Sequence, residues 1–244
     1  MGGIPYNAST YSACGATAFL EKIMIKRLFL LILVAITLAA CGGDSAINYE
    51  LGELLVEYTF DDEDIDNNGE SDWDTFAFEV ASINFGFLDE AYITTSMGGG
   101  YIWAQNRTTY QDIVIEVSTD PKTFYGGDSV YGIVCRAHPT NNNMGYYFLI
   151  RGDGSFGIRQ GDGTQVKMLH RWTKHDAIRI GEKNTIRAVC IDNYFAMYIN
   201  GKFAGEVTDN WFEEGRIAFA INSTEGVPIA ISYDNLKVWE ATKQ

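Results

Sequence analysis

The chain has 244 residues, of which 46% are hydrophobic and 14% aromatic, so it is long and apolar enough to bury a core. It carries 32 acidic and 18 basic residues, which give a formal net charge of -14. This balance argues against nucleic acid as a partner, because phosphate recognition needs a basic surface. It equally argues against docking of the folded part on anionic lipid head groups.

The first informative segment is MIKRLFLLILVAITLAAC, residues 24–41. Lys26 and Arg27 precede a run of thirteen apolar residues, which is too short to span a bilayer and suits the apolar region of a secretory signal. The run ends in small residues before Cys41, as in the lipobox of bacterial lipoproteins. We predict a signal peptide at 24–40, a lipid on Cys41 as the only membrane attachment, and a location at the bacterial cell surface. The alternatives are an ordinary secretory signal and a buried strand.

The residues on either side of this signal are predicted to lack regular structure. Residues 1–23 are rich in Gly, Ala and Ser without an apolar period, so we expect a disordered upstream extension. Residues 41–52 are expected to form a flexible tether between the lipid and the folded domain.

An acid-rich stretch, DEDIDNNGESDWD at 62–74, follows the first predicted strand. Alternating oxygen side chains and a glycine for the sharp turn match the register of a calcium-binding loop. Thr75 stands where an EF-hand has its bidentate Glu, so the stretch is more similar to the shorter calcium loops of extracellular repeats. The predicted Ca²⁺ ligands are Asp64, Asp66, Asn68, Glu70 and Asp72. A solvated acidic linker is the alternative.

The rest of the chain predicts short β-strands separated by Gly, Asp and Asn turns such as RGDGS and YINGK. The predicted strands are 53–60, 91–96, 100–105, 112–119, 129–137, 145–152, 155–160, 165–170, 184–192, 194–201, 202–207, 215–222 and 229–240. One short helical turn is expected around 208–214. This pattern predicts a single all-β domain at 53–240, an antiparallel β-sandwich of the jelly-roll type.

Two cysteines lie beyond the signal, Cys135 in VYGIVCRAH and Cys190 in TIRAVCIDN. By strand alternation, Cys135 shares a face with Tyr131 and Ile133, and Cys190 shares one with Ile186, so both are predicted to be buried. Export permits a disulfide between neighbouring strands. Two free buried thiols are the alternative.

The C-terminal half resembles a known family. Its motifs are GxxCR, YYFxIxxDGxxxI, AIxxGxxN, YxNG and DNxxVW, spread over roughly 129–240. They are similar to those of the concanavalin A-like, or laminin-G-like, jelly-roll domains of bacterial exported lipoproteins, which are related to the 3-keto-disaccharide hydrolases. Members often carry a cysteine pair at these places, so the resemblance implies a Cys135–Cys190 bridge. It leaves function open, since jelly rolls host binding, catalytic and structural roles.

Aromatic side chains beside polar ones are typical of sugar sites in sandwich lectins. The predicted ligand-binding residues are Trp103, Arg136, Tyr147, Arg151 and Trp172, with Tyr146 and Trp211 as further candidates. The sequence does not group them on one sheet face, and each aromatic has a core role as its alternative.

No catalytic residue is predicted. The three histidines lack metal-ligand spacing, and no pair of carboxylates is marked out for glycosidase chemistry. The sequence therefore predicts non-catalytic binding of a carbohydrate or another cell-envelope ligand. The alternatives are a glycoside-acting hydrolase of the keto-disaccharide hydrolase type and a structural or assembly module that makes protein contacts.

Overall fold

The computed structural model describes residues 47–65, 68–79, 83–123, 127–141 and 143–244. The predicted extension, signal peptide, Cys41 and Asp66 lie outside these residues, so the predictions on them stay predictions. None of the described segments forms a helix long and apolar enough to cross a membrane.

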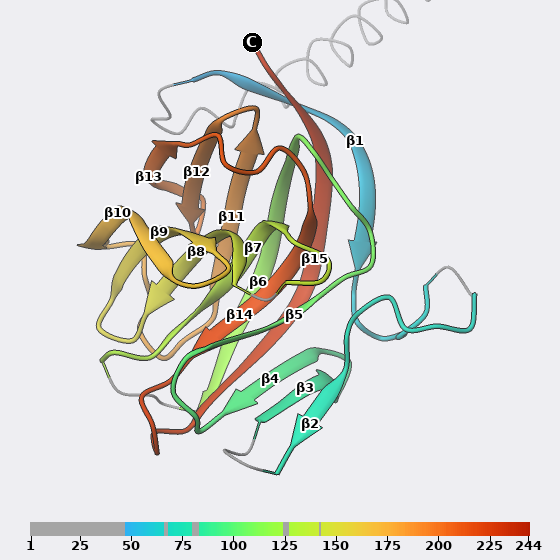
Figure 1. Ribbon diagram of the computed structural model, residues 1–244, viewed down its shortest axis with the longest axis vertical. Helices are drawn as coiled ribbons and strands as arrows, with labels where there is room; N and C mark the ends of the chain where they lie inside the picture. The colour runs from blue at the N-terminus through green and yellow to red at the C-terminus, as the bar shows by residue number, and fades with distance from the viewer. Residues whose placement is uncertain (1–46, 66–67, 80–82, 124–126, 142) are drawn as a thin grey trace, which may run out of the picture. The chain divides into compact units, whose positions relative to one another are not determined.

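The described residues form an all-β sandwich of two antiparallel sheets, which confirms the predicted fold class (Figure 1). Across the nine-stranded sheet, the strands are β13 (Lys202–Thr208), β12 (Tyr194–Ile199), β11 (Asn184–Ile191), β6 (Ile113–Thr123), β15 (Ile229–Lys243), β4 (Tyr92–Ser96), β3 (Ile83–Phe87) and β2 (Phe76–Phe78), with β1 (Tyr49–Tyr58) also paired to β15. Across the six-stranded sheet, they are β10 (Val166–Lys174), β9 (Ser155–Asp162), β8 (Met144–Arg151), β7 (Val130–Ala137), β14 (Arg216–Asn222) and β5 (Tyr101–Gln105).

Strand alternation divides the side chains between the core and the outer faces of the sandwich. In β8, Tyr146, Phe148 and Ile150 belong to the main core cluster, whereas Tyr147 and Leu149 belong to a separate cluster on the other face of the sheet. The six-stranded sheet is therefore apolar on both of its faces.

The last strand organises the nine-stranded sheet. One edge of β15 pairs with β6 from Ala230 to Glu240. Its other edge pairs first with β4, as Ile231 does with Thr94, and then with β1, as Lys243 does with Tyr49. The strands on the two sides of β15 are thus held in one sheet by β15.

Three expectations about local structure need correction. Residues 49–52 are not a flexible tether, because they begin β1 and pair with the end of β15. The helical turn predicted around 208–214 is absent. The backbone N–H groups of Trp211 and Phe212 donate to the Tyr146 hydroxyl, and not to the carbonyls that a helical turn would provide. The short strands β2 and β3 were not predicted.

Trp73 fixes the end of the acid-rich stretch to the sandwich. Its side chain is fully buried and stacks on Phe219, with ring centroids 4.4 Å apart and an interplanar angle of 7°. The backbone N–H of Asp74 donates to the carbonyl of Gln105 at 3.0 Å. The stretch is therefore anchored at its C-terminal end by core packing.

Cys135 and Cys190 form a disulfide, which confirms the predicted bridge. Cys135 lies on β7 and Cys190 on β11, so the bridge joins the two sheets and not neighbouring strands of one sheet. It closes a loop of 55 residues, for which chain entropy gives about 4 kcal/mol of stabilisation.

Candidate functional site: the outer face of the six-stranded sheet

Six residues with aromatic or guanidinium side chains gather on the outer face of the six-stranded sheet. We call this group the outer aromatic face; its members are Tyr101, Trp103, Tyr147, Arg151, Arg159 and Trp172. They come from β5, β8, β9 and β10, which are far apart in sequence and brought together by the strand order. Strand alternation points the residues of β5, β8 and β9 away from the sandwich core, because their chain neighbours pack in it. Trp172 joins them by packing over Gly157 on the same face.

Tyr147 lies beneath the other rings of this face. Its ring is fully buried and lies parallel to the indole of Trp103, with centroids 5.6 Å apart and an interplanar angle of 5°. The ring of Tyr101 meets it edge-on at 5.4 Å. β14, which pairs with β5, presents the small side chains Ala218 and Ala220 on this face, so the large rings can meet above them.

Trp172 lies on the same face and has two arginines against its ring. The guanidinium carbon of Arg159 is 4.6 Å from the ring centroid, and that of Arg151 is 5.5 Å from it. Cation–π attraction stabilises both contacts. The indole lies over Gly157, where an added Cβ would be 3.0 Å from its Cε3 atom. The missing side chain at this position therefore makes room for Trp172.

Buried polar atoms without a hydrogen-bond partner collect on this face. Among the described residues, they include Trp103 Nε1, Tyr147 OH, Arg159 Nε and the nearby Gln105 Oε1. Each such atom costs about 1–3 kcal/mol, and native proteins hold few of them. These orphaned donors and acceptors lie among the half-buried rings of Tyr101 and Trp172.

Burial shifts the pKa values on this face. It raises the pKa of the Tyr147 and Tyr101 hydroxyls, because an ionised phenolate is poorly solvated there. Burial also lowers the pKa of Arg159, and the positive charge of Arg151 lowers it further. A guanidinium nevertheless stays protonated, so the face presents neutral phenols and positive arginines.

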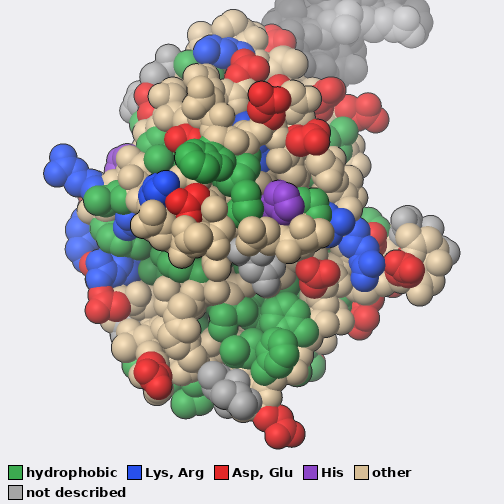
Figure 2. Space-filling model, in the orientation of Figure 1, with side chains coloured by type: hydrophobic (Ala, Val, Ile, Leu, Met, Phe, Trp, Pro, Cys, Tyr) green, Lys and Arg blue, Asp and Glu red, His purple; other side chains and the backbone are tan. Residues whose placement is uncertain are grey.

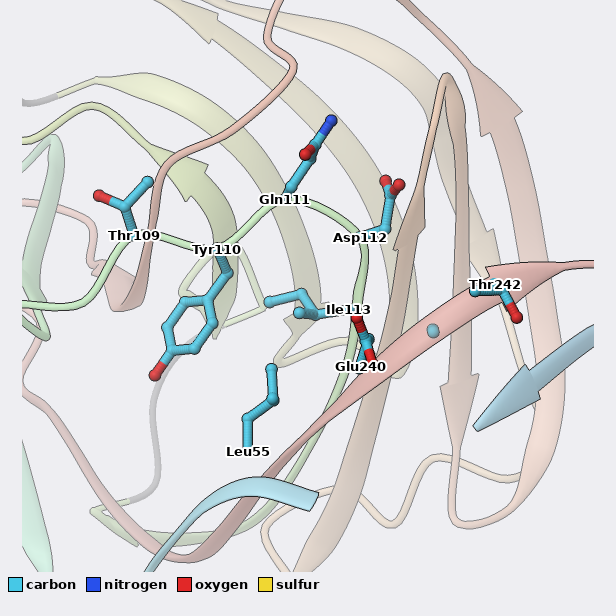
Figure 3. A pocket seen from close by; sticks show the side chains of 9 residues that line it. Leu55, Thr109, Tyr110, Gln111, Asp112, Ile113, Glu240 and Thr242 are labelled. Carbon is cyan, nitrogen blue, oxygen red and sulfur yellow. The ribbon is translucent and has the colours of Figure 1, made fainter. Parts of the chain in front are cut away.

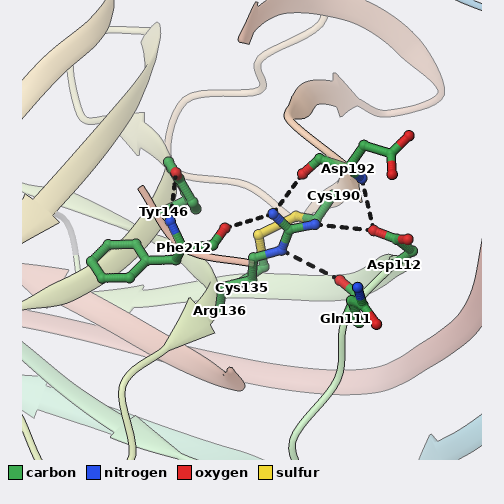
Figure 4. Close-up of polar contacts among 8 residues, drawn as sticks. All are labelled: Gln111, Asp112, Cys135, Arg136, Tyr146, Cys190, Asp192 and Phe212. Carbon is green, nitrogen blue, oxygen red and sulfur yellow. Dashed lines mark hydrogen bonds and ion pairs between the residues drawn. A yellow bond between two sulfur atoms is a disulfide. The ribbon is translucent and has the colours of Figure 1, made fainter. Parts of the chain in front are cut away.

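The structure separates three sequence candidates, Arg136, Tyr146 and Trp211, from this group. Arg136 has a positive φ of 53° and sits where β7 shifts register against β14, so its side chain points to the end of the sandwich. There it donates to the carbonyls of Gln111, Asp192 and Phe212 and to the carboxylate of Asp112 at 3.1 Å (Figure 4).

Arg136 is only 2% exposed, and each of its guanidinium nitrogens has a protein partner, so it clamps the structure beside the disulfide. Tyr146 also faces inward, where it stacks on Phe195 at 3.9 Å. Trp211, 56% exposed, lies in the loop after β13 with Lys167 over its ring. The sequence candidates Trp103, Tyr147, Arg151 and Trp172 do come together.

The acid-rich stretch uses its described side chains on its own backbone. Asp64 accepts from the N–H groups of Asn68 at 3.0 Å and Gly69 at 2.6 Å, and Asp72 accepts from Ile65 at 2.8 Å. Glu70 pairs with an exposed Arg107. Within the described ranges there is no group of three or more His, Cys, Asp or Glu residues placed to hold a metal ion. Calcium binding here remains a prediction, since Asp66 lies outside those ranges.

Three hollows of the described surface lie away from this face. One of about 330 Å³ opens between β1, β6 and β15, where Leu55, Tyr110 and Ile113 lie with the carboxylates of Asp112 and Glu240 (Figure 3). Asp112 is engaged by Arg136, and no aromatic platform other than Tyr110 lines this hollow. It offers less for ligand recognition than the outer aromatic face does.

Sequence reasoning missed two members of the face, Tyr101 and Arg159. The signal for Arg159 is present: Phe156 and Ile158 face the core, so alternation along β9 turns Arg159 outward. The pairing of Arg159 with Tyr147 on β8 then brings it to the aromatic group.

Comparison with known proteins finds similarity in fold. No protein-family model matches the chain. No curated protein matches it either. Among solved structures, the carbohydrate-binding module CBM66 from Bacillus subtilis has a TM-score of 0.56 at 12% identity, covering 70% of this chain and 94% of that chain.

Two further structures show the same architecture. A Bacillus subtilis protein of unknown function with a galectin-like fold has a TM-score of 0.56 at 11% identity, covering 81% of this chain and 100% of that one. A Bacteroides ovatus GH16 protein in complex with a G4G4G3G product has a TM-score of 0.52 at 11% identity, covering 76% and 100%. The described part of this chain accordingly shares the jelly-roll sandwich fold of these structures, as the sequence predicted.

Proposed function

We propose that this protein is a non-catalytic carbohydrate-binding lipoprotein, exported and held at the bacterial cell surface by a lipid on Cys41. The observation that carries the binding function is the outer aromatic face. Sugar rings stack on indole and phenol rings, and their hydroxyls need hydrogen-bond partners. Half-buried Tyr101 and Trp172 offer such rings, beside buried polar atoms that have no hydrogen-bond partner among the described residues.

The similar structures support a carbohydrate ligand. One is a carbohydrate-binding module, and another is a GH16 protein solved in complex with a G4G4G3G product. Their identity to this chain is low, so they support the class of ligand through the shared fold and leave its chemistry to the residues of this chain.

The residues of the six-stranded sheet support binding without catalysis. Glycoside hydrolysis ordinarily uses two carboxyl groups roughly 5–10 Å apart. The six strands contain a single acidic residue, Asp162 at the end of β9, and its carboxylate is paired with Lys167 at 2.7 Å. A carboxylate pair on this face would therefore have to come from outside its strands.

Export is supported by two independent features. The segment at 24–41 has the charge, apolar length and terminal cysteine of a lipoprotein signal. The Cys135–Cys190 disulfide fits a protein that matures in an oxidising compartment. Radiolabelled palmitate should enter the protein in a bacterial host, and a Cys41→Ala variant should lose the label.

The binding function is tested with the full chain on a glycan array and by affinity electrophoresis in polysaccharide gels. We expect Trp172→Ala to weaken binding about tenfold or more. The matched control is Trp239→Ala, because Trp239 is a partly buried indole on the outer face of the other sheet. Equal losses in both variants, or no retardation by any polysaccharide, would contradict a carbohydrate site on this face.

A further inference from the structure

The six-stranded sheet has the opposite charge to the whole chain. Its strands carry one acidic residue, Asp162, in a chain with 32 acidic and 18 basic residues. Their basic residues are Arg136, Arg151, Arg159, Lys167, Arg171, Lys174 and Arg216. Figure 2 shows Lys and Arg side chains gathered where β10 lies in Figure 1, at the edge of this sheet.

Arg159 is a buried basic residue of this sheet that lacks an ion pair among the described residues. It is only 9% exposed, and its Nε has no hydrogen-bond partner within this part of the chain. Among the described residues, the cation–π partner of its guanidinium is the Trp172 ring, at 4.6 Å. A buried guanidinium is costly to hold without a carboxylate or another anion, because burial removes its hydration.

Arg151 adds a second positive charge to the same place. Its guanidinium lies over the same indole at 5.5 Å, and its carboxylate partner, Asp128, is 73% exposed at the rim. Ion pairs with so exposed a partner contribute little and exchange readily with solvent or with a ligand anion. Two like charges are therefore held against one ring, and Asp128 pairs with only one of them.

The neighbouring Tyr101 does not neutralise the pair. Burial raises the pKa of its hydroxyl, so the phenol stays protonated and acts as a hydrogen-bond donor beside the arginines. The outer aromatic face thus combines a ring for stacking, two guanidiniums and a phenolic donor, with no carboxylate from its own strands at its centre.

We propose that the ligand of this face is an anionic glycan, whose carboxylate or sulfate group is bound by Arg159 and Arg151 beside the Trp172 indole. A guanidinium fork binds such planar or tetrahedral oxyanions through paired N–H donors. The negative charge of the rest of the chain repels a polyanion, so the basic sheet also selects where the glycan docks. This inference rests on the proposed carbohydrate function and names its ligand class.

The test measures the affinity of the full chain for polysaccharides by affinity electrophoresis. Polygalacturonate is compared with its methyl ester, and dextran sulfate with dextran. Polyphosphate is the control for a polyanion without sugar. We expect the carboxylated or the sulfated glycan to bind at least tenfold tighter than its neutral counterpart, and tighter than polyphosphate. The arm that binds identifies the anion.

Arg159→Gln should lower the affinity for the anionic glycan about tenfold. Arg151→Gln should lower it less, and Arg159→Lys should keep part of it. Lys243→Gln is the charge-matched control, since Lys243 is exposed at the end of β15 in the other sheet. Thermal melting checks that each variant is folded. Arg151→Gln decides the outcome if Arg159→Gln does not fold.

Equal binding of charged and neutral glycans would overturn this inference and leave carbohydrate binding standing. Polyphosphate binding as tight as the best glycan, or full binding by both arginine variants, would also overturn it. Binding of no glycan at all would overturn the proposed function itself.

Discussion

The indole of Trp172 occupies the space that a side chain at Gly157 would take, because a Cβ there would lie 3.0 Å from Cε3 and 3.2 Å from Cζ3 of the ring. Gly157 lies on β9 and Trp172 on β10, so the glycine sets the position of the ring on the neighbouring strand. The position of the Trp172 ring thus depends on Gly157, which has no side chain to contact a ligand.

Gly157→Ala should therefore weaken glycan binding about as much as loss of the Trp172 ring does, because the methyl group displaces the indole. Overpacking of this kind also costs about 1–3 kcal/mol of stability. Urea denaturation and affinity electrophoresis measure the two effects separately. Gly86→Ala is the control, since nothing lies within 4 Å of an added Cβ there. Unchanged binding by Gly157→Ala would contradict this role of the ring.

Arg136→Met should destabilise the protein without altering the ligand site. The substitution leaves the carbonyls of Asp192 and Phe212 without their donor and the Asp112 carboxylate without its ion pair. We expect a loss of about 3–5 kcal/mol in the free energy of unfolding, measured by chemical denaturation. Arg171→Met, at an exposed position of β10, should cost little. A loss of glycan affinity in folded Arg136→Met would show that Arg136 has a role in binding after all.

Alkaline pH should destabilise the protein through its buried tyrosines. Burial raises the pKa of Tyr49 to about 12, and it also raises that of Tyr92, Tyr101, Tyr110, Tyr146, Tyr147 and Tyr233. The unfolded chain loses these protons near its ordinary tyrosine pKa of about 10, while the folded chain keeps them. The stabilisation is therefore complete below about pH 10 and is lost as the pH rises from there through the folded pKa values.

Each such tyrosine should contribute about 1.4 kcal/mol of lost stability per pH unit in this window. Urea denaturation between about pH 8 and pH 11 measures the slope, and the tyrosinate absorbance of the folded protein reports the titration directly. If nearly all of the 14 tyrosines ionise near their ordinary pKa before the protein unfolds, this expectation is wrong.

Calcium should stabilise the protein through the acid-rich stretch if that stretch binds it as the sequence predicts. A hundredfold excess over the dissociation constant would add about 2.7 kcal/mol, which corresponds to a rise of roughly 5–10 °C in Tm. Asp66→Ala should abolish the rise, whereas Asp176→Ala, at an exposed site outside the stretch, should leave it intact. If calcium does not change the Tm, the stretch is a solvated linker that Trp73 anchors to the core.

Local sequence patterns predict most of the strands of the fold. Alternating apolar residues and hairpin turns such as the one at Asn200 and Gly201, both with positive φ, place the strands of the C-terminal half within a few residues. They failed where tertiary pairing decides the structure. The segment at 49–52 looks like a tether and becomes a strand only because β15 offers it an edge. The short β2 and β3 depend on β4 in the same way.

The candidate site could be predicted only in part for a related reason. Trp103 and Tyr147 meet because β14 and β7 lie between β5 and β8, an order that local sequence does not contain. Arg136 was misplaced because a register shift turns it away from the direction that simple alternation gives. Arg159 was within reach of alternation, but its importance comes from what is missing around it, and this depends on the folded neighbours.

The position of β15 also bears on when the protein can fold. Before residues 229–243 leave the ribosome, β6, β11, β12 and β13 have no link within the sheet to β1, β2, β3 and β4. The first strand then waits for the last one, since Tyr49 pairs with Lys243. The nine-stranded sheet is therefore completed only when its C-terminal strand is available. Removal of the last strand would leave two half-sheets with open edges, prone to pair with other chains.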